Sequence, residues 1–255
     1  MPQKRTAAAP RIRSGAAPSL APTILPSAAP APVATPRSAR AAATRLELLL
    51  AAERLFALHG LMGVSLRQIV AATRQRNLAT VHYHFGSREA LAHAICDLRM
   101  PAIEQARAQR LSAYLEDPPP PARRAVELLR IQIEPSAEPV FAARGRSHFR
   151  RLLAHSFVSD EIDLRRYIGS HYDRGIRQTG RLLRTESAHL SAATFAVRWA
   201  LLIRSMTYLL ASLEARVEAL SWRKGEALLR AEMAEMAVAF AGFFAAPDEA
   251  NGGTA

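Results

Sequence analysis

Cysteine is almost absent from this chain. The 255 residues include one, Cys96, so a disulfide framework within the chain is excluded and the CxxC pairs of structural zinc sites are missing. A reducing compartment, the cytoplasm, is therefore the expected location. Cys96 itself is either a small buried thiol or a redox-sensing one.

Long apolar runs are also absent. No segment approaches the roughly 18 uninterrupted apolar residues of a transmembrane helix, and no apolar segment follows Lys4 and Arg5 to make a signal peptide. We therefore expect no membrane partner. Apolar residues nevertheless make up 49% of the chain, which is enough for a packed core.

Lysine is scarce as well, since only Lys4 and Lys224 are present and arginine supplies the other positive charges. The net charge is +12. Such an excess favours an anionic partner, either nucleic acid or an acidic membrane surface. Arginine suits bidentate contacts with phosphate and guanine, although the alanine-rich composition explains the arginine content equally well as codon bias.

Acidic residues are missing from residues 1–43, which carry six basic side chains. The prolines of this segment are too closely spaced for a helix, and its few large apolar residues cannot offset the entropy of ordering. We expect a disordered tail, which is either a basic arm that adds DNA affinity or a solvated extension. Residues 247–255 are also expected to be disordered.

From residue 44 onward the pattern is helical. Thr44 and Glu47 have the spacing of a capping box, and Gly60 is a suitable C-terminal stop for that helix. Ser65 and Gln68 repeat the capping-box spacing before a short second helix.

Two more N-caps follow. Asn77 opens a third helix of about seven residues, and Ser87 opens a long fourth helix with a kink or break near Pro101. No segment alternates like a strand, so the fold class is all-α. After the prolines near residue 119, helices are expected at 122–134, 141–157, 160–184, 188–218 and 222–244.

The third helix has two different sides. Val81 and Phe85, four residues apart, fall on one side, where they would anchor the helix to a core. Thr80, Tyr83 and His84 fall on the other side. Each of these three carries a polar atom beside an apolar body, which suits phosphates and base edges. The second and third helices, joined by a turn of about five residues, predict a helix-turn-helix whose second helix enters the major groove.

Three segments extend this pattern: "TRLELLLAAERLFALHG", "VSLRQIVAAT" and "NLATVHYHFGSREAL". Together they resemble the DNA-binding domain of the TetR family of bacterial transcriptional regulators. That family has a first helix ending in Phe-x-x-x-Gly and a recognition helix ending in aromatic and His residues before Phe. The resemblance implies a DNA-binding domain at 44–90 and a helical ligand-binding and dimerisation domain at 91–246.

The resemblance also implies which residues contact DNA. Two positions depart from the family pattern: the turn "TRQRN" lacks the usual glycine, and Leu78 replaces a frequently polar residue. Leu78 either meets a thymine methyl group or packs into the core, and Arg74 and Arg76 are either phosphate contacts or solvated charges. By position, the implied DNA contacts are Arg67, Gln68, Asn77, Thr80, His82, Tyr83, His84 and Arg88.

The last two helices carry apolar residues three and four positions apart, which indicates apolar stripes. Part of each stripe is expected to fill the subunit's own core. The resemblance implies that the rest pairs with a second copy in a four-helix bundle, and a homodimer would double the contact with a palindromic operator. The predicted interface comprises Trp199, Met206, Leu209, Met233 and Phe240.

The resemblance further implies an effector cavity between the DNA-binding domain and the dimer helices. Histidines 148, 155 and 171 are candidate polar contacts there, and Tyr167 is a further candidate for the wall. Each of these is otherwise a core or rim residue. The predicted lining comprises Phe141, Phe149, Leu153, Phe157 and Tyr172.

The sequence thus predicts a sequence-specific DNA-binding transcriptional regulator, a ligand-responsive repressor acting as a dimer with double-stranded DNA and an unidentified small molecule as partners. We expect no cofactor and no metal, because the spacings of His82, His84 and His93 do not converge without other ligands. The alternatives are a non-specific architectural DNA-binding protein and an all-helical enzyme. No catalytic motif such as HExxH or a P-loop is present, so we expect no enzymatic activity.

Overall fold

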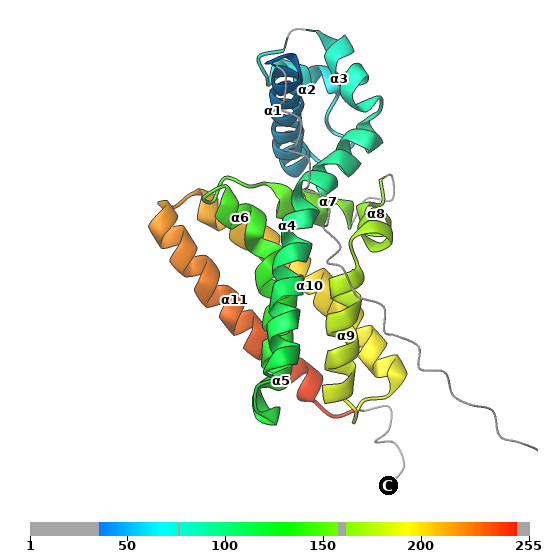
Figure 1. Ribbon diagram of the computed structural model, residues 1–255, viewed down its shortest axis with the longest axis vertical. Helices are drawn as coiled ribbons and strands as arrows, with labels where there is room; N and C mark the ends of the chain where they lie inside the picture. Colours follow the sequence, from blue (N-terminus) through cyan, green and yellow to red (C-terminus); the bar gives the residue numbers. More distant parts are fainter. Residues whose placement is uncertain (1–35, 76, 158–161, 249–255) are drawn as a thin grey trace, which may run out of the picture.

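The computed structural model describes residues 36–75, 77–157 and 162–248. These residues form helices and turns without a strand (Figure 1), so the predicted all-α class is confirmed. No helix among them has the length and apolar character needed to cross a membrane. The elements are α1 (Pro36–His59), α2 (Leu66–Ala71), α3 (Leu78–Phe85), α4 (Arg88–Glu116), α5 (Pro121–Ile133), the 3₁₀ helix η1 (Glu134–Ala137), α6 (Glu138–Ala142), α7 (Phe149–Ser156), α8 (Leu164–His171), α9 (Arg174–Glu186), α10 (Ala192–Glu218) and α11 (Trp222–Ala245).

The helix ends in the N-terminal part follow local sequence signals. Ser65 Oγ accepts from the backbone N–H of Gln68 at 3.2 Å, and Gln68 Oε1 accepts from the backbone N–H of Ser65 at 2.7 Å. The predicted capping box of α2 is therefore confirmed. Asn77 and Ser87 cap α3 and α4 through their side chains. Gly60 follows α1 with a φ of 76°, a conformation that favours glycine.

The start of α1 corrects the sequence analysis. Thr44 lies inside α1, which begins at Pro36, so the capping box predicted at Thr44 is wrong. Residues 36–43 are helical rather than part of a disordered tail, because proline is tolerated in a first helical turn and residues 41–43 are alanines. The remainder of the predicted tail, residues 1–35, lies outside the described residues.

The C-terminal end also differs from the prediction. Asp248 Oδ2 accepts from the backbone N–H of Ser191 at 2.6 Å, and its Oδ1 accepts from Thr194 Oγ1 at 2.7 Å. Residues 247 and 248 are therefore ordered against the start of α10, while 249–255 lie outside the described residues.

Two of the long helices predicted after residue 140 are each interrupted. The expected helix at 141–157 is divided into α6 and α7 by a turn in which Arg144 and Gly145 have φ values of 47° and 82°. The described part of the helix expected at 160–184 is divided at Tyr172 and Asp173. By contrast, α4 continues without interruption through Pro101, where the sequence predicts a kink or a break.

The helices form an N-terminal unit, α1 to α3 with the first turns of α4, joined to a larger C-terminal bundle (Figure 1). Helix α4 runs from the first into the second, and α7 packs against both α1 and α10. One apolar core lies around Phe56, Ile69 and Ile95, and a second lies around Leu128 and Leu213. The two parts are thus joined by α4 and α7.

Candidate DNA-binding surface and internal cavity

Helix α3 presents one face to the core and the other to solvent. Val81 and Phe85 are buried, as the helical wheel predicted, and Tyr83 is 85% exposed. Thr80 and His84 are half-buried on the outer side. The exposed phenol ring is unusual for so large a side chain, and it identifies this face as a candidate contact surface.

The rings on α3 restrain one another. Tyr83 and His84 make an edge contact with their ring centroids 5.2 Å apart. His82 is exposed, and its Nδ1 lies 3.1 Å from the carbonyl oxygen of Gly86. Because a carbonyl only accepts, Nδ1 must donate, which leaves Nε2 as the acceptor of the neutral ring. The His82 ring at the end of α3 is therefore held in a defined orientation.

The turn before α3 is held by a carboxylate of α1. Glu47 Oε1 accepts from the backbone N–H of Arg74 at 2.7 Å, and Glu47 Oε2 accepts from Gln75 Nε2 at 3.2 Å. The hydrogen bond from Arg74 is the main cause that lowers the pKa of Glu47. Sequence reasoning assigned Glu47 to a capping box and missed this role. These two hydrogen bonds stabilise a turn that lacks the glycine usual in the family.

Several predicted DNA contacts are already engaged within the chain. Asn77 Oδ1 accepts from the backbone N–H of Ala79, and Gln68 Oε1 is held in the capping box, so the amide Nε2 of Gln68 is the group left for DNA. Arg88 Nη1 lies 3.2 Å from Met62 Sδ. Arg67 is exposed on α2.

Leu78, the first residue of α3, and Arg45, which lies beside that helix, differ in their exposure. Leu78 is half-buried and packs against the core of the N-terminal unit, which favours the core alternative over a thymine contact. Arg45, which sequence reasoning did not select, is exposed on α1 with its guanidinium carbon 5.2 Å from the ring centre of Phe85. Its position gives the surface around α3 one more positive charge.

A cavity of about 350 Å³ lies in the C-terminal bundle. Its wall includes Ile103 of α4, Leu153 of α7, Ile176 of α9 and Ile203 of α10, and residues of α5, η1 and α8 complete it. Buried polar side chains also reach this wall, among them Arg150, whose pKa is lowered to about 9 by burial. The cavity therefore combines an apolar lining with buried positive charge.

Two family models match the chain. Residues 48–95 match the model described as bacterial regulatory proteins, tetR family, and residues 132–242 match the tetracyclin repressor-like C-terminal domain. The chain belongs to the TetR family. It is a DNA-binding, helix-turn-helix transcriptional regulator. No curated protein matches it.

The lining of the cavity in this TetR-family regulator agrees only partly with the predicted one. Leu153 and Phe157 are on its wall, but Phe141, Phe149 and Tyr172 are not. Phe141 contacts the ring of Trp222 edge-on, Phe149 of α7 is buried in the same apolar core as Phe56 and Ile95, and Tyr172 donates a hydrogen bond to Asp97 at 2.7 Å. These three aromatic residues have structural partners elsewhere.

The polar candidates for the cavity are also engaged elsewhere. His155 Nε2 lies 3.0 Å from the carbonyl oxygen of Ala57, and His171 Nδ1 lies 2.8 Å from that of Tyr167. Tyr167 itself donates to Asp97. His148 belongs to a separate polar network, and none of the three histidines is on the cavity wall.

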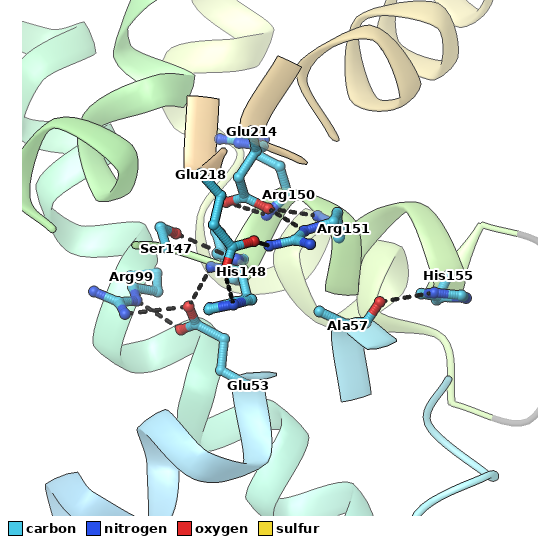
Figure 2. A network of polar contacts seen from close by, with 11 residues as sticks. Glu53, Ala57, Arg99, Ser147, His148, Arg150, Arg151, His155, Glu214 and Glu218 are labelled. Carbon is cyan, nitrogen blue, oxygen red and sulfur yellow. Dashed lines mark hydrogen bonds and ion pairs between the residues drawn. The ribbon is translucent and has the colours of Figure 1, made fainter. Parts of the chain in front are cut away.

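That network surrounds the N-terminal end of α7 (Figure 2). The backbone N–H of His148 donates to Glu53 Oε1 of α1 at 2.9 Å, while His148 Nε2 lies 3.1 Å from Glu218 Oε1 of α10. Burial lowers the pKa of His148, so the neutral ring, with Nε2 as donor to the carboxylate, is the favoured form. Glu214 of α10 accepts from the backbone N–H groups of Arg150 and Arg151. The start of α7 is thereby bonded to both α1 and α10.

The apolar stripes on α10 and α11 are divided between an internal and an external side. Met206 and Met233 are buried in the subunit's own core, so their assignment to a dimer surface is wrong. Trp199 and Phe240 are half-buried against the same core, whereas Leu209 is 46% exposed. The large apolar side chains exposed on these two helices are Val197, Leu201, Tyr208, Leu209 and Val238.

Proposed function

We propose that this TetR-family regulator is a ligand-responsive repressor that binds a palindromic operator as a homodimer in the cytoplasm, without a catalytic step. The observation that carries the proposal is that α4 belongs to both parts of the molecule. It begins directly after the exposed helix α3, and its residues Met100, Ile103 and Arg107 line the cavity. A ligand in the cavity therefore contacts the helix that supports the DNA-binding surface.

The proposed DNA contacts divide by chemistry. Tyr83, His82, His84 and Thr80 would meet base edges and nearby phosphates, since α3 is the second helix of the helix-turn-helix. Basic and amide groups around it would hold the sugar-phosphate backbone and set the register. These are Arg67, Gln68, Asn77 and Arg88, with Arg45 as an addition from the structure.

Dimerisation is proposed through the exposed apolar sides of α10 and α11. Leu201 and Leu209 on α10 and Val238 on α11 would be buried against the same residues of a second copy. One helix of eight residues reaches few base pairs, so two recognition helices are needed for a specific site. This face replaces the one predicted around Met206 and Met233.

The proposed control passes through α4 and α7. Arg150 and Leu153 of α7 line the cavity, and the start of the same helix is bonded to Glu53 of α1 and Glu214 of α10. A ligand that favours a different position of α7 or α4 would change the separation of the two recognition helices. Operator binding requires a separation of about 34–36 Å, so such a ligand would lower DNA affinity.

Footprinting on the DNA beside the protein's own gene tests this function. We expect a protected palindrome and, in sedimentation velocity experiments, a dimer both free and on that DNA. Protection without sequence preference would favour an architectural role instead. A stable monomer at micromolar concentration would contradict the homodimer.

A further inference from the structure

The cavity has a buried polar end, which is assembled around Ser136 of η1, and the exposed Arg165 and Arg204 also reach its wall. Arg150 Nε donates to the carbonyl oxygen of Ser136 at 2.5 Å, and Arg107 Nη2 lies 3.5 Å from Ser136 Oγ. Ser136 Oγ in turn donates to the carbonyl oxygen of Gln132 at 3.3 Å. All four residues of this polar end are buried and line the cavity. The rest of the wall is mainly apolar, with Met100, Ile103, Leu153, Phe157, Ile168, Ile176, Ile203 and Met206.

Gln132 has no partner for its side chain. The residue is fully buried, and neither its amide nitrogen nor its amide oxygen forms a hydrogen bond within the described part of the chain. A buried amide without partners is unfavourable, and such groups usually receive an explanation from a bound molecule. Gln132 therefore indicates a ligand that offers hydrogen-bonding atoms at this end of the cavity.

The positive charge at the polar end is only partly balanced. Arg107 is paired with Glu104, although its Nε has no partner among the described residues. Arg150 forms no ion pair with a carboxylate in the described ranges, because the nearby Glu214 accepts instead from the backbone of α7 and from Arg151. The buried guanidinium of Arg150 thus has the charge of Glu214 nearby but no carboxylate bonded to it in the described ranges, and an anionic ligand would supply one.

Taking the cavity as the effector site, as the proposed function does, we infer that the effector is an organic monoanion, a carboxylate with an apolar body. Its carboxylate binds Arg150 and the free Nε–H of Arg107, and it accepts a hydrogen bond from the Gln132 amide. Its body lies among the aliphatic side chains of α4, α9 and α10. Arg165 and Arg204 on the wall are exposed, so Arg150 is the one buried arginine of the described wall without an ion pair. One such guanidinium matches one negative charge, which favours a carboxylate over a doubly charged phosphate ester.

Calorimetric titration of the full-length protein tests the inference with decanoate and 2-naphthylacetate, against decan-1-ol and decyl phosphate. We expect at least one carboxylate to bind, and the alcohol and the phosphate to bind about tenfold or more weakly. The inference is wrong if neither carboxylate binds, or if decan-1-ol binds as tightly as decanoate.

Two variants locate the binding site. Arg150→Met should weaken carboxylate binding by roughly tenfold to a hundredfold, whereas Arg146→Met, which removes an exposed arginine outside the cavity, should not. Gln132→Leu should raise the melting temperature of the ligand-free protein and weaken carboxylate binding. Because it removes an unpaired amide, this variant keeps the test valid if Arg150→Met does not fold. Unchanged carboxylate affinity in Gln132→Leu would overturn the inference.

Release of operator DNA is measured separately by fluorescence anisotropy. A carboxylate that binds the cavity but leaves DNA affinity unchanged supports the ligand class and contradicts the proposed control of DNA binding. A neutral compound that occupies the cavity and releases DNA supports the proposed control of DNA binding and contradicts the ligand class.

Discussion

Glu53 of α1 and Arg99 of α4 form a two-point ion pair, with Arg99 Nε 2.7 Å from Glu53 Oε2 and Arg99 Nη2 3.2 Å from Glu53 Oε1 (Figure 2). The same carboxylate accepts the backbone N–H of His148 at the start of α7. Glu53 is 1% exposed, so these partners replace water as its hydrogen-bond donors. The three residues fix the orientation of the N-terminal unit on the C-terminal bundle.

Removing this carboxylate should be costly. Glu53→Ala leaves the largely buried Arg99 and the His148 N–H without their acceptor, and we expect the free energy of unfolding to fall by about 3–5 kcal/mol. Urea denaturation measures the loss. Glu89→Ala, at an exposed carboxylate on α4, is the control and should change stability far less. A loss equal to that of the control would contradict the assigned role of Glu53.

The turn before α3 gives a prediction about DNA binding. Glu47→Ala removes the acceptor of the Arg74 N–H and the Gln75 amide, so α3 should be less well positioned and DNA affinity should fall roughly fivefold. Charge alone predicts the opposite, because losing a carboxylate reduces repulsion of phosphate. Glu89→Ala again serves as the control and should bind DNA as well or better. Tighter DNA binding by Glu47→Ala would show that the hydrogen bonds of Glu47 to the turn do not contribute to DNA affinity.

The exposed side of α10 and the buried side of α11 should respond differently to substitution. Leu209→Arg places a charge on the exposed side and should yield folded monomers in sedimentation velocity experiments. Met233→Ala creates a cavity in the subunit core and should lower the free energy of unfolding by about 2–5 kcal/mol. A dimeric Leu209→Arg variant would exclude this side of α10 as the interface.

Cys96 should be unreactive in the folded protein. Burial raises the pKa of its thiol from 9.0 to about 12, so almost no thiolate exists at pH 8. The thiol pKa is higher in the folded chain than in the unfolded chain. The contribution of Cys96 to the free energy of unfolding is therefore fully present below pH 9 and is lost as the pH rises towards 12. We expect a thiol-specific disulfide reagent to react at pH 8 only when urea unfolds the chain. Rapid reaction of the native protein would restore the redox-sensing alternative.

Local signals could be predicted from the sequence. The Ser65–Gln68 box and the caps at Asn77 and Ser87 depend on residues three or fewer positions apart. The inward side of α3, with Val81 and Phe85, follows from helical periodicity alone. The false capping box at Thr44 has the same spacing, but alanines and an early proline extend α1 beyond it.

The cavity and the dimer side could not be predicted in the same way. Periodicity indicates that α10 has an apolar stripe, but it does not show which part of the stripe the same subunit covers, so Met206 was assigned to the wrong side. The lining depends on how helices from α4 to α10 pack, and aromatic residues are a poor guide to it. Phe149 fills a core, while Gln132 and Arg150 define the buried polar end. No short-range signal marks those two residues.

The central claim, that the exposed side of α3 contacts DNA, is tested most directly at Tyr83. Tyr83→Ala should weaken binding to the footprinted DNA roughly tenfold to a hundredfold in fluorescence anisotropy, with unchanged helicity and an unchanged oligomeric state. The control, Tyr208→Ala, removes an exposed tyrosine from α10 and should leave DNA affinity unaltered in the dimeric fraction. Equal affinity of Tyr83→Ala and the unaltered protein would contradict the account.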